Sequence, residues 1–423
     1  MRILIATDAF PPVAGGSGWS TYELANGLRA RGHHIVIVQP YSRRAPASFD
    51  GFEVRGYPVK APAMPFVQNY FRNERLYRHL AVALGALIRE HDIDVIHAQH
   101  ELTGPASVRA ARIAGIPSVC TIRDYWPLCY WSDLVRDPAV GDTCPGCSAG
   151  AMTRCLPPRV GPVWPLTTAF IPYMRANLRG KQRDVGGADA VVAVSTQVAS
   201  YLRERSPEIA AGRVEVIPNG VDIVRMRSLV AGAARPMAEP YAVFIGKLAH
   251  NKGVSALVDV VEHAQLNMPL VVIGDGPERA MLLKAALRTS TGIRVLQWME
   301  RDEVFRWLGH AEFLIFPSSW PEPLSRVLLE ASALSRPIAA MNTGGTADIV
   351  VDEVTGLLSA SAVELAEGVA RLAGDADLRA RLGSAAGRRA EELFDVPVVI
   401  GRMEALYADV IERARKRRER GVA

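Results

Sequence analysis

Two glutamates, Glu322 and Glu330, lie eight residues apart in the stretch FPSSWPEPLSRVLLEASALSRP. If this stretch is helical, eight residues span about 12 Å of the helix axis and return to nearly the same face. Two carboxylates placed in this way can hold opposite ends of one elongated ligand. Glu330 lies among apolar residues, where a carboxylate needs a partner such as a ribose diol. The alternative is that Glu330 closes a buried polar pocket that holds no ligand.

The residue after Glu322 predicts a helix start. Proline is favoured at the first position of a helix, so Pro323 places Glu322 at the mouth of the helix. The first backbone amides of a helix have no partner within it and can bind a phosphate or a sugar hydroxyl. These amides belong to Leu324, Ser325 and Arg326.

Two lysines follow an apolar run in the stretch FIGKLAHNKGVSALVDVV. Lys247 and Lys252 are expected on the loop after a strand, and Gly253 and Ser255 open the next helix. Lysines at the carboxyl edge of a parallel sheet can neutralise a diphosphate. Single lysines at such places are usually only solvated, but their combination with a helix N-terminus favours phosphate binding.

A glycine loop follows the first apolar run of the chain. The run ends at Thr7, a Pro- and Gly-rich loop containing Gly15 and Gly16 comes next, and a helix is expected over residues 20–31. Such a loop can hold a phosphate, because no side chain blocks the backbone amides. It is not the G-x-G-x-x-G dinucleotide motif. A tight strand-to-helix turn without a ligand is the alternative.

Apolar runs rich in Val and Ile alternate with helical patterns along most of the chain. Runs of this kind are typical of strands buried on both faces of a parallel sheet, and the alternation predicts an α/β fold. The expected strands are residues 2–7, 34–39, 95–98, 117–122, 190–194, 214–217, 241–246, 269–274, 293–296, 312–316 and 337–340.

The stretch IPNGVD, residues 217–222, predicts a domain boundary, because an extended Ile-Pro leads into an Asn-Gly turn. We expect two doubly wound, Rossmann-like domains over residues 1–220 and 221–396, facing across a cleft. A C-terminal helix over residues 397–423 is expected to pack back on the first domain. An irregular Cys-containing insertion is expected over about residues 125–160.

Composition narrows the classes of protein. The chain has 423 residues, 49% of them hydrophobic, which suits two globular domains. No apolar stretch reaches the length of a membrane helix and the N-terminus lacks a signal-peptide pattern, so we expect a cytoplasmic protein. The net charge is +5, with the positive excess in residues 1–220. This favours an anionic partner, but no nucleic-acid-binding motif accompanies the charge.

Four cysteines lie within the expected insertion. Cys129, Cys144, Cys147 and Cys155 could close a tetrahedral zinc site that orders an otherwise irregular loop. Only the CPGC pair has a tight spacing, so free thiols and a disulfide remain alternatives. Cys120 is expected in the core.

The order of these blocks resembles one enzyme family. Glu322 and Glu330 match the E-x7-E signature of the large retaining GT-B glycosyltransferase family 4. The blocks GGSG, DVIHAQH, IPNGVD, GKLAHNKG, VVIGDGPER and NTGGTADIVVDEVTGLL resemble its motifs in the same order, over nearly the whole chain. The resemblance implies a GT-B fold, with an acceptor domain first and a nucleotide-sugar donor domain second.

The resemblance also implies roles for residues. Lys247, at a position that is usually Arg, and Lys252 would contact the diphosphate, and Glu330 would hold the ribose. Glu322, with the amides near Leu324 and Ser325, would face the donor sugar. Fixed cations and helix dipoles would then stabilise the leaving group, and no catalytic metal is expected.

Further donor contacts are implied in both domains. Gly15 and Gly16 would close over the donor and the acceptor from the first domain. Trp298 and Met299 would lie along the base. The expected co-substrate is a UDP- or GDP-linked hexose.

One block departs from the family. The stretch TIRDYWPLC has Arg123 where the family usually has a histidine that contacts the donor sugar. Arginine cannot act as a base at neutral pH, but it can donate several hydrogen bonds. Arg123 could hold donor or acceptor, with Asp124 lining the same corner. It could instead pair with Asp124 or another acid to shape the site, or mark a lost activity.

The acceptor is the least determined partner. Residues 64–92 and 163–183 mix aromatic and basic residues, as a membrane-surface or lipid-linked acceptor would require. Ordinary amphipathic helices explain the pattern equally well. We therefore expect a hexosyltransferase of polysaccharide, lipid-linked sugar or secondary-metabolite biosynthesis, at the inner membrane face if it binds membranes. A non-catalytic sugar-nucleotide-binding protein is the main alternative, and a nicotinamide oxidoreductase is a weaker one.

Overall fold

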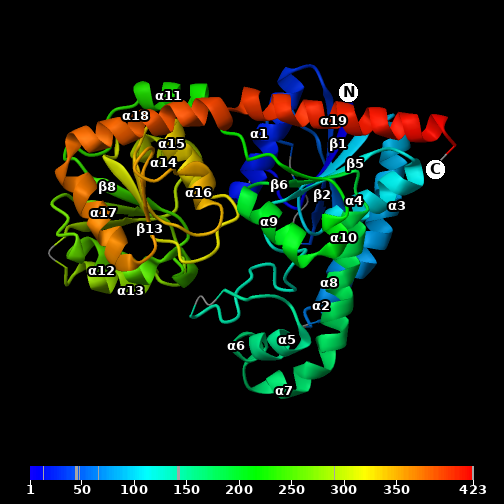
Figure 1. The fold of residues 1–423 in the computed structure, drawn as a ribbon, viewed down its shortest axis with the longest axis horizontal. Helices are drawn as coiled ribbons and strands as arrows, with labels where there is room; N and C mark the ends of the chain where they lie inside the picture. The colour runs from blue at the N-terminus through cyan, green and yellow to red at the C-terminus, as the bar shows by residue number, and fades with distance from the viewer. Residues whose placement is uncertain are drawn as a thin grey trace. The chain divides into compact units, whose positions relative to one another are not determined.

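The computed structural model describes all residues except 13, 43–45, 47, 65, 141–142, 290 and 422–423. Parts of the expected insertion, of the expected C-terminal helix and of the segment 64–92 therefore lie outside the described residues. The chain forms two compact units (Figure 1). The first contains Met1–Leu134, Cys144–Gly220 and Val396–Ala423, and the second contains Val135–Thr143 and Val221–Asp395.

The first unit is built on a parallel sheet in the order β3-β2-β1-β4-β5-β6-β7. Six of these strands were predicted, and the edge strand β3 was not. The strands are β1 (Arg2–Ala6), β2 (His34–Tyr41), β3 (Val54–Pro58), β4 (Val95–Ala98), β5 (Ser118–Ile122), β6 (Ala190–Ala193) and β7 (Val214–Val216). Ala6 pairs with Ala98, and Ala98 pairs with Cys120, so three central strands end at one edge.

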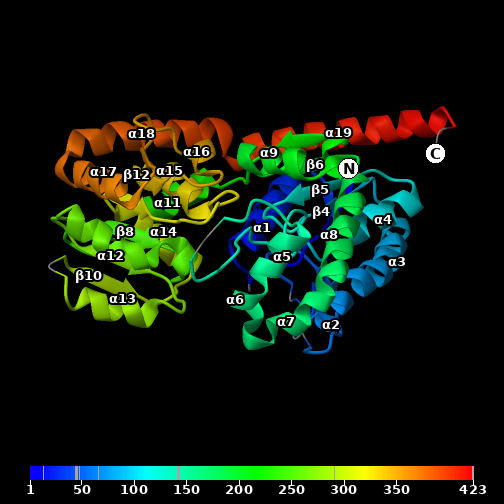
Figure 2. The ribbon, with the colours of Figure 1, turned by 60° about the horizontal axis from the view of Figure 1, so that its bottom comes forward.

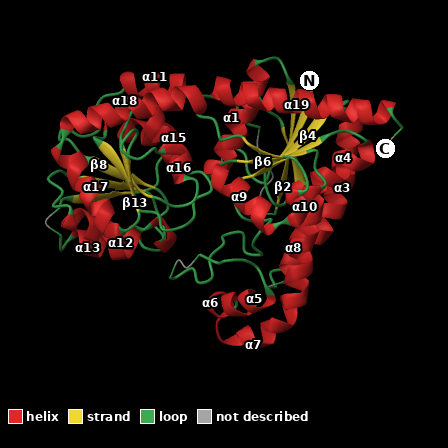
Figure 3. Ribbon diagram, viewed as in Figure 1, coloured by secondary structure: helices red, strands yellow, loops and turns green. Residues whose placement is uncertain are grey.

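Helices cover both faces of this sheet (Figure 3). The helices of the first unit are α1 (Gly16–Ala30), α2 (Val67–Tyr70), the π-helix η1 (Phe71–Arg75), α3 (Leu76–Glu90), α4 (Gly104–Ala114), α5 (Ala149–Cys155), α6 (Pro157–Val160), η2 (Gly161–Val163), α7 (Trp164–Thr167), η3 (Thr168–Phe170), α8 (Ile171–Gly186), α9 (Thr196–Arg205), α10 (Pro207–Ala210) and α19 (Val396–Glu419).

The last helix, α19, belongs to the core of the first unit. Its buried positions recur every three or four residues and include Ile400, Met403 and Tyr407, as expected for a helix with one apolar face. This face packs with Leu24 of α1 and Ile3 of β1 in one apolar cluster. A change in this face would therefore open the core of the first unit.

The second unit has a six-stranded parallel sheet in the order β10-β9-β8-β11-β12-β13. Its strands are β8 (Ala242–Ile245), β9 (Leu270–Ile273), β10 (Ile293–Leu296), β11 (Phe313–Phe316), β12 (Ile338–Met341) and β13 (Leu357–Ser359). Its helices are α11 (Ile223–Ala231), η4 (His250–Lys252), α12 (Val254–His263), α13 (Arg279–Ala286), α14 (Arg301–His310), α15 (Arg326–Ala333), α16 (Thr346–Ile349), α17 (Ala362–Gly374) and α18 (Ala376–Leu393).

Each sheet has the alternating strand-and-helix order of a Rossmann-like domain, so the predicted α/β class is confirmed. The edge strand β13 of the second unit was not predicted. Within the described part of the chain, no helix has both the length and the apolarity needed to cross a bilayer.

Candidate active site

A lysine and a glutamate from separate loops meet at the carboxyl edge of the second sheet. Lys252, which ends η4, donates a hydrogen bond to Glu322 Oε1, and Ser318 Oγ donates to the same oxygen at 2.8 Å. The ammonium also lies 5.0 Å from the ring centre of Trp320. Glu322 is buried, while Lys252 keeps a quarter of its side chain exposed. The structure thus joins two of the residues that the sequence nominated separately.

Two glycines let the backbone close around this pair. Gly344 has φ +56°, and a Cβ there would stand 2.2 Å from the backbone oxygen of Glu322. Gly253 has φ +74°, and a Cβ there would stand 1.9 Å from the oxygen of Pro317. No side chain fits at either position, and φ in this range also favours glycine. Both close approaches fix the loops that carry Lys252 and Glu322.

The helix after Glu322 begins later than predicted. The predicted start at Pro323 is wrong, because α15 begins at Arg326 with Ser325 as its N-cap. Residues 322–325 instead form an irregular turn held by a hydrogen bond from the Gly345 amide to the Glu322 oxygen, 2.6 Å. Among the described residues no hydrogen bond involves the backbone amides of Leu324 and Ser325. These amides are available to a ligand.

Glu330 lies in α15 and is buried, as its apolar sequence setting indicated. Its Oε1 accepts a hydrogen bond from Arg326 Nε at 2.9 Å and lies 3.7 Å from Arg301 Nε. The guanidinium of Arg301 also lies over the ring of Phe305, 4.8 Å from its centre. The carboxylate therefore has protein partners that orient it, which the sequence reading did not identify.

The remaining candidates of the second unit lie on loops. Lys247 follows β8 and is exposed, without an ion pair to any described residue. Trp298 and Met299 lie between β10 and α14. Trp298 has 68% of its surface exposed, which is unusual for so large an aromatic residue.

The glycine loop of the first unit opens a helix directly. Helix α1 begins at Gly16, four residues before the predicted start, and Gly15 is its N-cap. A Cβ at Gly15 would meet no atom within 4 Å, so the space beside the helix N-terminus is open. No acidic side chain lies in the first turn.

A polar cluster lies where β1, β4 and β5 end. Asp8, His100 and Asp124 each follow their strand by two residues, and in a parallel sheet such positions share one edge. Asp8 Oδ2 accepts a hydrogen bond from the Leu102 amide at 3.0 Å, and Asp124 Oδ1 accepts one from the Trp126 amide at 2.9 Å. Only Asp124 of these three had been nominated from the sequence.

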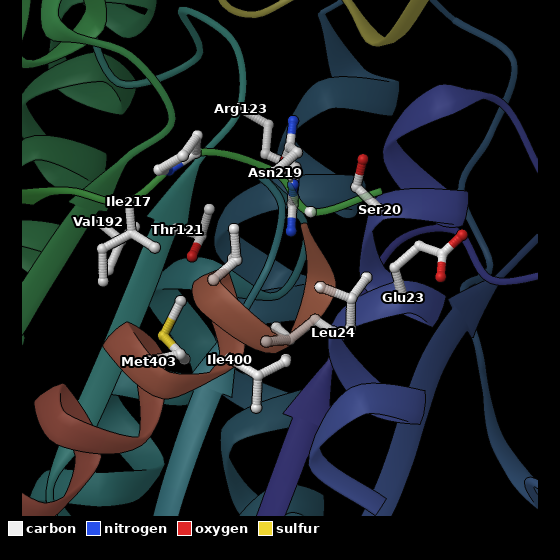
Figure 4. A pocket seen from close by; sticks show the side chains of 14 residues that line it. Ser20, Glu23, Leu24, Thr121, Arg123, Val192, Ile217, Asn219, Ile400 and Met403 are labelled. Atoms are coloured by element: carbon white, nitrogen blue, oxygen red, sulfur yellow. Dashed lines mark hydrogen bonds between the residues drawn. The ribbon is translucent and has the colours of Figure 1, made fainter. Parts of the chain in front are cut away.

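Arg123 contacts two amide side chains of the same unit. It donates to Asn219 Oδ1 in the IPNGVD segment and to Gln99 Oε1 after β4, the latter at 2.5 Å. Figure 4 shows Arg123 and Asn219 at one side of a pocket whose opposite side is formed by Ile400 and Met403 of α19. Arg123 thus joins three segments far apart in sequence.

Burial changes the acidity of the cluster. Burial, together with the nearby carboxylates of Glu101 and Asp124, raises the pKa of Asp8 to about 7. Burial likewise raises the pKa of Asp124 to about 7. Glu101 itself pairs with the buried Lys181 of α8, with 2.6 Å between Nζ and Oε1. Two carboxyl groups therefore titrate near neutral pH at this edge.

Three buried polar atoms of the cluster have no partner among the described residues: Asp8 Oδ1, Gln99 Nε2 and His100 Nε2. Burial and the charge of Arg123 lower the pKa of His100 to about 3, so the ring is neutral. Its Nδ1 accepts from the Asp8 amide at 3.3 Å, which leaves Nε2 as a hydrogen-bond donor. Buried polar atoms are normally satisfied, so these three atoms leave unused hydrogen-bonding capacity at this edge.

The expected zinc site is not present among the described residues, where no group of three or more potential ligands could hold a metal ion. The thiol of Cys144 donates to the Gly146 oxygen and that of Cys155 to the Met152 oxygen. The side chains of Cys129 and Cys147 instead share a hydrogen bond, which lowers the pKa of Cys129. All four thiols are free, as is that of Cys120 in the core.

Several residues of the two sites were missed from the sequence. Asp8 and His100 stand one and two residues after predicted strands, so their position at strand ends was a usable signal. Ser318 likewise follows the predicted strand 312–316 by two residues. Arg301 gave no such signal, because its role depends on a contact with Glu330 of another helix.

Two family models match the chain. The model described as Glycosyltransferase Family 4 matches residues 14–225. The model described as Glycosyl transferases group 1 matches residues 229–389. Together they span both units.

Named relatives are distant but match along most of their length. A glycogen synthase of Mycobacterium tuberculosis is 25% identical, over 96% of this chain and 94% of its own. A D-inositol 3-phosphate glycosyltransferase of Xylanimonas cellulosilytica is 26% identical, over 95% and 93%. A GDP-mannose-dependent alpha-mannosyltransferase of Mycobacterium tuberculosis is 26% identical, over 85% and 83%.

Solved structures share the fold. The Anabaena protein HepE in complex with UDP has a TM-score of 0.65 and 19% identity, covering 97% of this chain and 100% of its own. Sucrose-phosphate synthase from Thermosynechococcus elongatus has a TM-score of 0.67 and 19% identity, covering 98% and 100%.

Proposed function

The chain belongs to glycosyltransferase family 4, has the GT-B fold and is an enzyme of the glycosyltransferase class, and we propose that it moves a hexose from a UDP- or GDP-sugar to an acceptor hydroxyl with retention of anomeric configuration. The observation that carries the proposal is the Lys252–Glu322 pair at the carboxyl edge of the second sheet. Ligands of open α/β sheets bind at this edge.

The second unit would bind the donor. A diphosphate would compete with Glu322 for the ammonium of Lys252, with Lys247 and the amides of Leu324 and Ser325 as further donors. The released carboxylate of Glu322 would accept hydrogen bonds from the sugar. Fixed positive charge lowers the barrier most where negative charge grows, which is on the departing diphosphate.

The nucleoside would lie along the rest of α15. Glu330, oriented by Arg326 and Arg301, is the acceptor of hydrogen bonds that a ribose diol requires. The exposed ring of Trp298 offers a surface for the base. Gly15 and Gly16 would contribute backbone amides from the first unit.

The first unit would hold the acceptor at the polar cluster. The unpaired atoms of Asp8, Gln99 and His100 supply one acceptor and two donors of hydrogen bonds, which suits a polyhydroxylated molecule. We propose that Arg123 and Asp124 orient the hydroxyl that is transferred to. A lipid-linked sugar, a polysaccharide or a secondary metabolite would each present such hydroxyls.

The first test measures release of UDP or GDP from sugar nucleotides by the purified protein. Lys252→Ala and Glu322→Ala should each lower kcat/KM at least about 100-fold, since each removes a contact to charge that develops during transfer. Lys284→Ala, an exposed lysine of α13, is the matched control and should change nothing. Equal rates for all three variants would show that the site assignment is wrong.

Two further measurements separate the alternatives. Calorimetry that finds tight sugar-nucleotide binding, with no nucleotide release for any acceptor, would indicate a non-catalytic binding protein. Proton NMR of the product reports the configuration of the new bond, and inversion would contradict the retaining mechanism.

A further inference from the structure

A helical lobe of the first unit carries large apolar side chains in water. The lobe consists of residues 149–175, which form α5, α6, α7 and the start of α8. Figure 1 shows these helices at the far end of α8, away from the strands of their sheet, and Figure 2 shows α6 and α7 toward the same end of α8. Most of its apolar residues pack inward around Met152, Leu156 and Met174.

Five large apolar side chains, three in the lobe and two in the segment 64–70 that packs on it through Phe66, are exposed to solvent. We call these five side chains the apolar tip. Leu166 is 77% exposed, Met64 62%, Val163 54%, and Tyr70 and Phe170 are each 40% exposed.

The members of the tip lie near one another. Val163, Leu166 and Phe170 lie in the consecutive short helices η2, α7 and η3. Phe170 stacks on Phe66, with ring centres 4.5 Å apart, and Phe66 lies in the turn between Met64 and Tyr70.

The lobe itself contributes only positive charge, and the carboxylates that contact it, Glu74 and Asp133, are already bonded to Tyr173 and Arg159. Residues 149–183 contain no Asp or Glu. Arg154, Arg175 and Arg179 are exposed and form no ion pair with a described residue. An apolar tip on a lobe that also carries unpaired arginines fits an anionic, apolar partner. A second copy of the chain would bring the same positive charge to the interface, which disfavours self-association through this face.

We propose that the lobe docks on an anionic phospholipid surface. The apolar tip would enter the acyl boundary, and the arginines would contact the lipid headgroups. Helix α8 connects the lobe to the polar cluster: Lys181, about 17 Å along the helix from Phe170, pairs with Glu101 there. A membrane-borne acceptor would therefore need to reach only a short distance from the bilayer.

The test is co-sedimentation of the full chain with phosphatidylcholine vesicles, with and without about 30 mol% phosphatidylglycerol. The wild type should bind only the anionic vesicles, and less at high salt. Leu166→Asp should weaken binding at least about tenfold, and the triple change of Arg154, Arg175 and Arg179 to Glu should abolish it.

Matched controls lie in the second unit. Leu287→Asp replaces a leucine that is 88% exposed, and Arg288→Glu replaces an exposed arginine beside it. Both variants should bind vesicles like the wild type. The proposal is overturned if the wild type does not co-sediment with anionic vesicles, or if the control variants weaken vesicle binding as much as the lobe variants do. It is also overturned if ultracentrifugation shows a dimer that Leu166→Asp dissolves. Because these measurements use no sugar nucleotide, their failure leaves the transferase proposal standing.

Discussion

Arg123 holds two neutral amide side chains, so its guanidinium is fixed within the first unit rather than free in solvent. A histidine could not reach both Asn219 and Gln99, because it has only two ring nitrogens at a shorter distance from the backbone. Compared with the histidine that is usual in the family, the arginine therefore changes both the charge at this position and the distance over which its side chain donates hydrogen bonds.

Replacing Arg123 tests the three interpretations of this residue. Arg123→Ala should lower kcat/KM at least about 100-fold if the guanidinium orients a substrate. Arg123→Lys keeps the charge but loses the forked contact, and should recover only part of the activity. Steady-state kinetics at varied donor and acceptor separate the two substrates. Unchanged kinetics, with a lower free energy of unfolding, would leave Arg123 a structural role only.

The acidic pair of the polar cluster predicts a pH effect on stability. Asp8 and Asp124 have a pKa of about 7 in the folded protein against an ordinary value of 3.8. The folded chain therefore binds protons that the unfolded chain has released, and the free energy of unfolding falls as pH rises from about 4 to 7.

Asp124→Asn removes one of these titrations. Between about pH 5 and 7 the free energy of unfolding of the variant should fall less than that of the wild type, by at least about 1.4 kcal/mol, the value of one pKa unit. Urea unfolding followed by circular dichroism at both pH values measures the difference. Parallel losses in both proteins would contradict the raised pKa of Asp124.

Residue spacing predicted some of the candidate site but not its contacts. Lys252 and Glu322 were found because each has a local signal, a loop after a strand in one case and a helix start in the other. Their mutual hydrogen bond depends on how β8 and β11 lie side by side, which no local pattern encodes. The Cys spacing suggested a metal, but the thiols of Cys144 and Cys155 turn to backbone oxygens.

Element boundaries were predicted less well than the elements. Pro323 favours a helix start, yet α15 begins three residues later, because Gly345 binds the Glu322 oxygen and holds the chain in a turn. The strands β3 and β13 were missed, and both are sheet edges. An edge strand is buried less uniformly, so its sequence lacks the continuous apolar run.

The turn that carries Glu322 depends on a glycine from the next strand connection. Gly344→Ala should displace the Glu322 backbone, since its Cβ would lie 2.2 Å from the Glu322 oxygen. We expect at least about a tenfold loss of UDP or GDP affinity and a lower unfolding midpoint. Calorimetry and thermal unfolding measure both. Gly292→Ala is the control, because a Cβ there meets no atom. Equal effects of the two substitutions would show that Gly344 does not specifically support the donor site.

Across the whole molecule, the residues proposed to bind the donor lie almost entirely in the second unit. Hydrogen–deuterium exchange of the full chain with UDP or GDP should show protection in residues 246–253 and 317–325, and none in the lobe, residues 149–175. Lys252→Ala should lose this protection. Protection confined to the first unit would show that the donor site is misplaced.

The fold class followed from the alternation of apolar runs, because a strand buried on both faces leaves a strong local signal. The C-terminal helix was expected to pack on the first domain, but its partners there did not follow from any local pattern. Its pattern predicts an amphipathic helix, but the surface that covers Ile400 and Met403 is built from β1 and α1, almost 400 residues earlier in the chain.

The first unit is discontinuous along the chain, and this sets an order of assembly during synthesis. Apart from the short segment Val135–Thr143, the second unit is one continuous stretch, complete once Asp395 has left the ribosome. The first unit begins 220 residues earlier, yet it lacks part of its core until α19 emerges. Domains usually complete folding from the N-terminal end. Here the N-terminal unit must finish last, with the apolar faces of its helix α1 and strand β1 uncovered in the nascent chain until the final helix closes them.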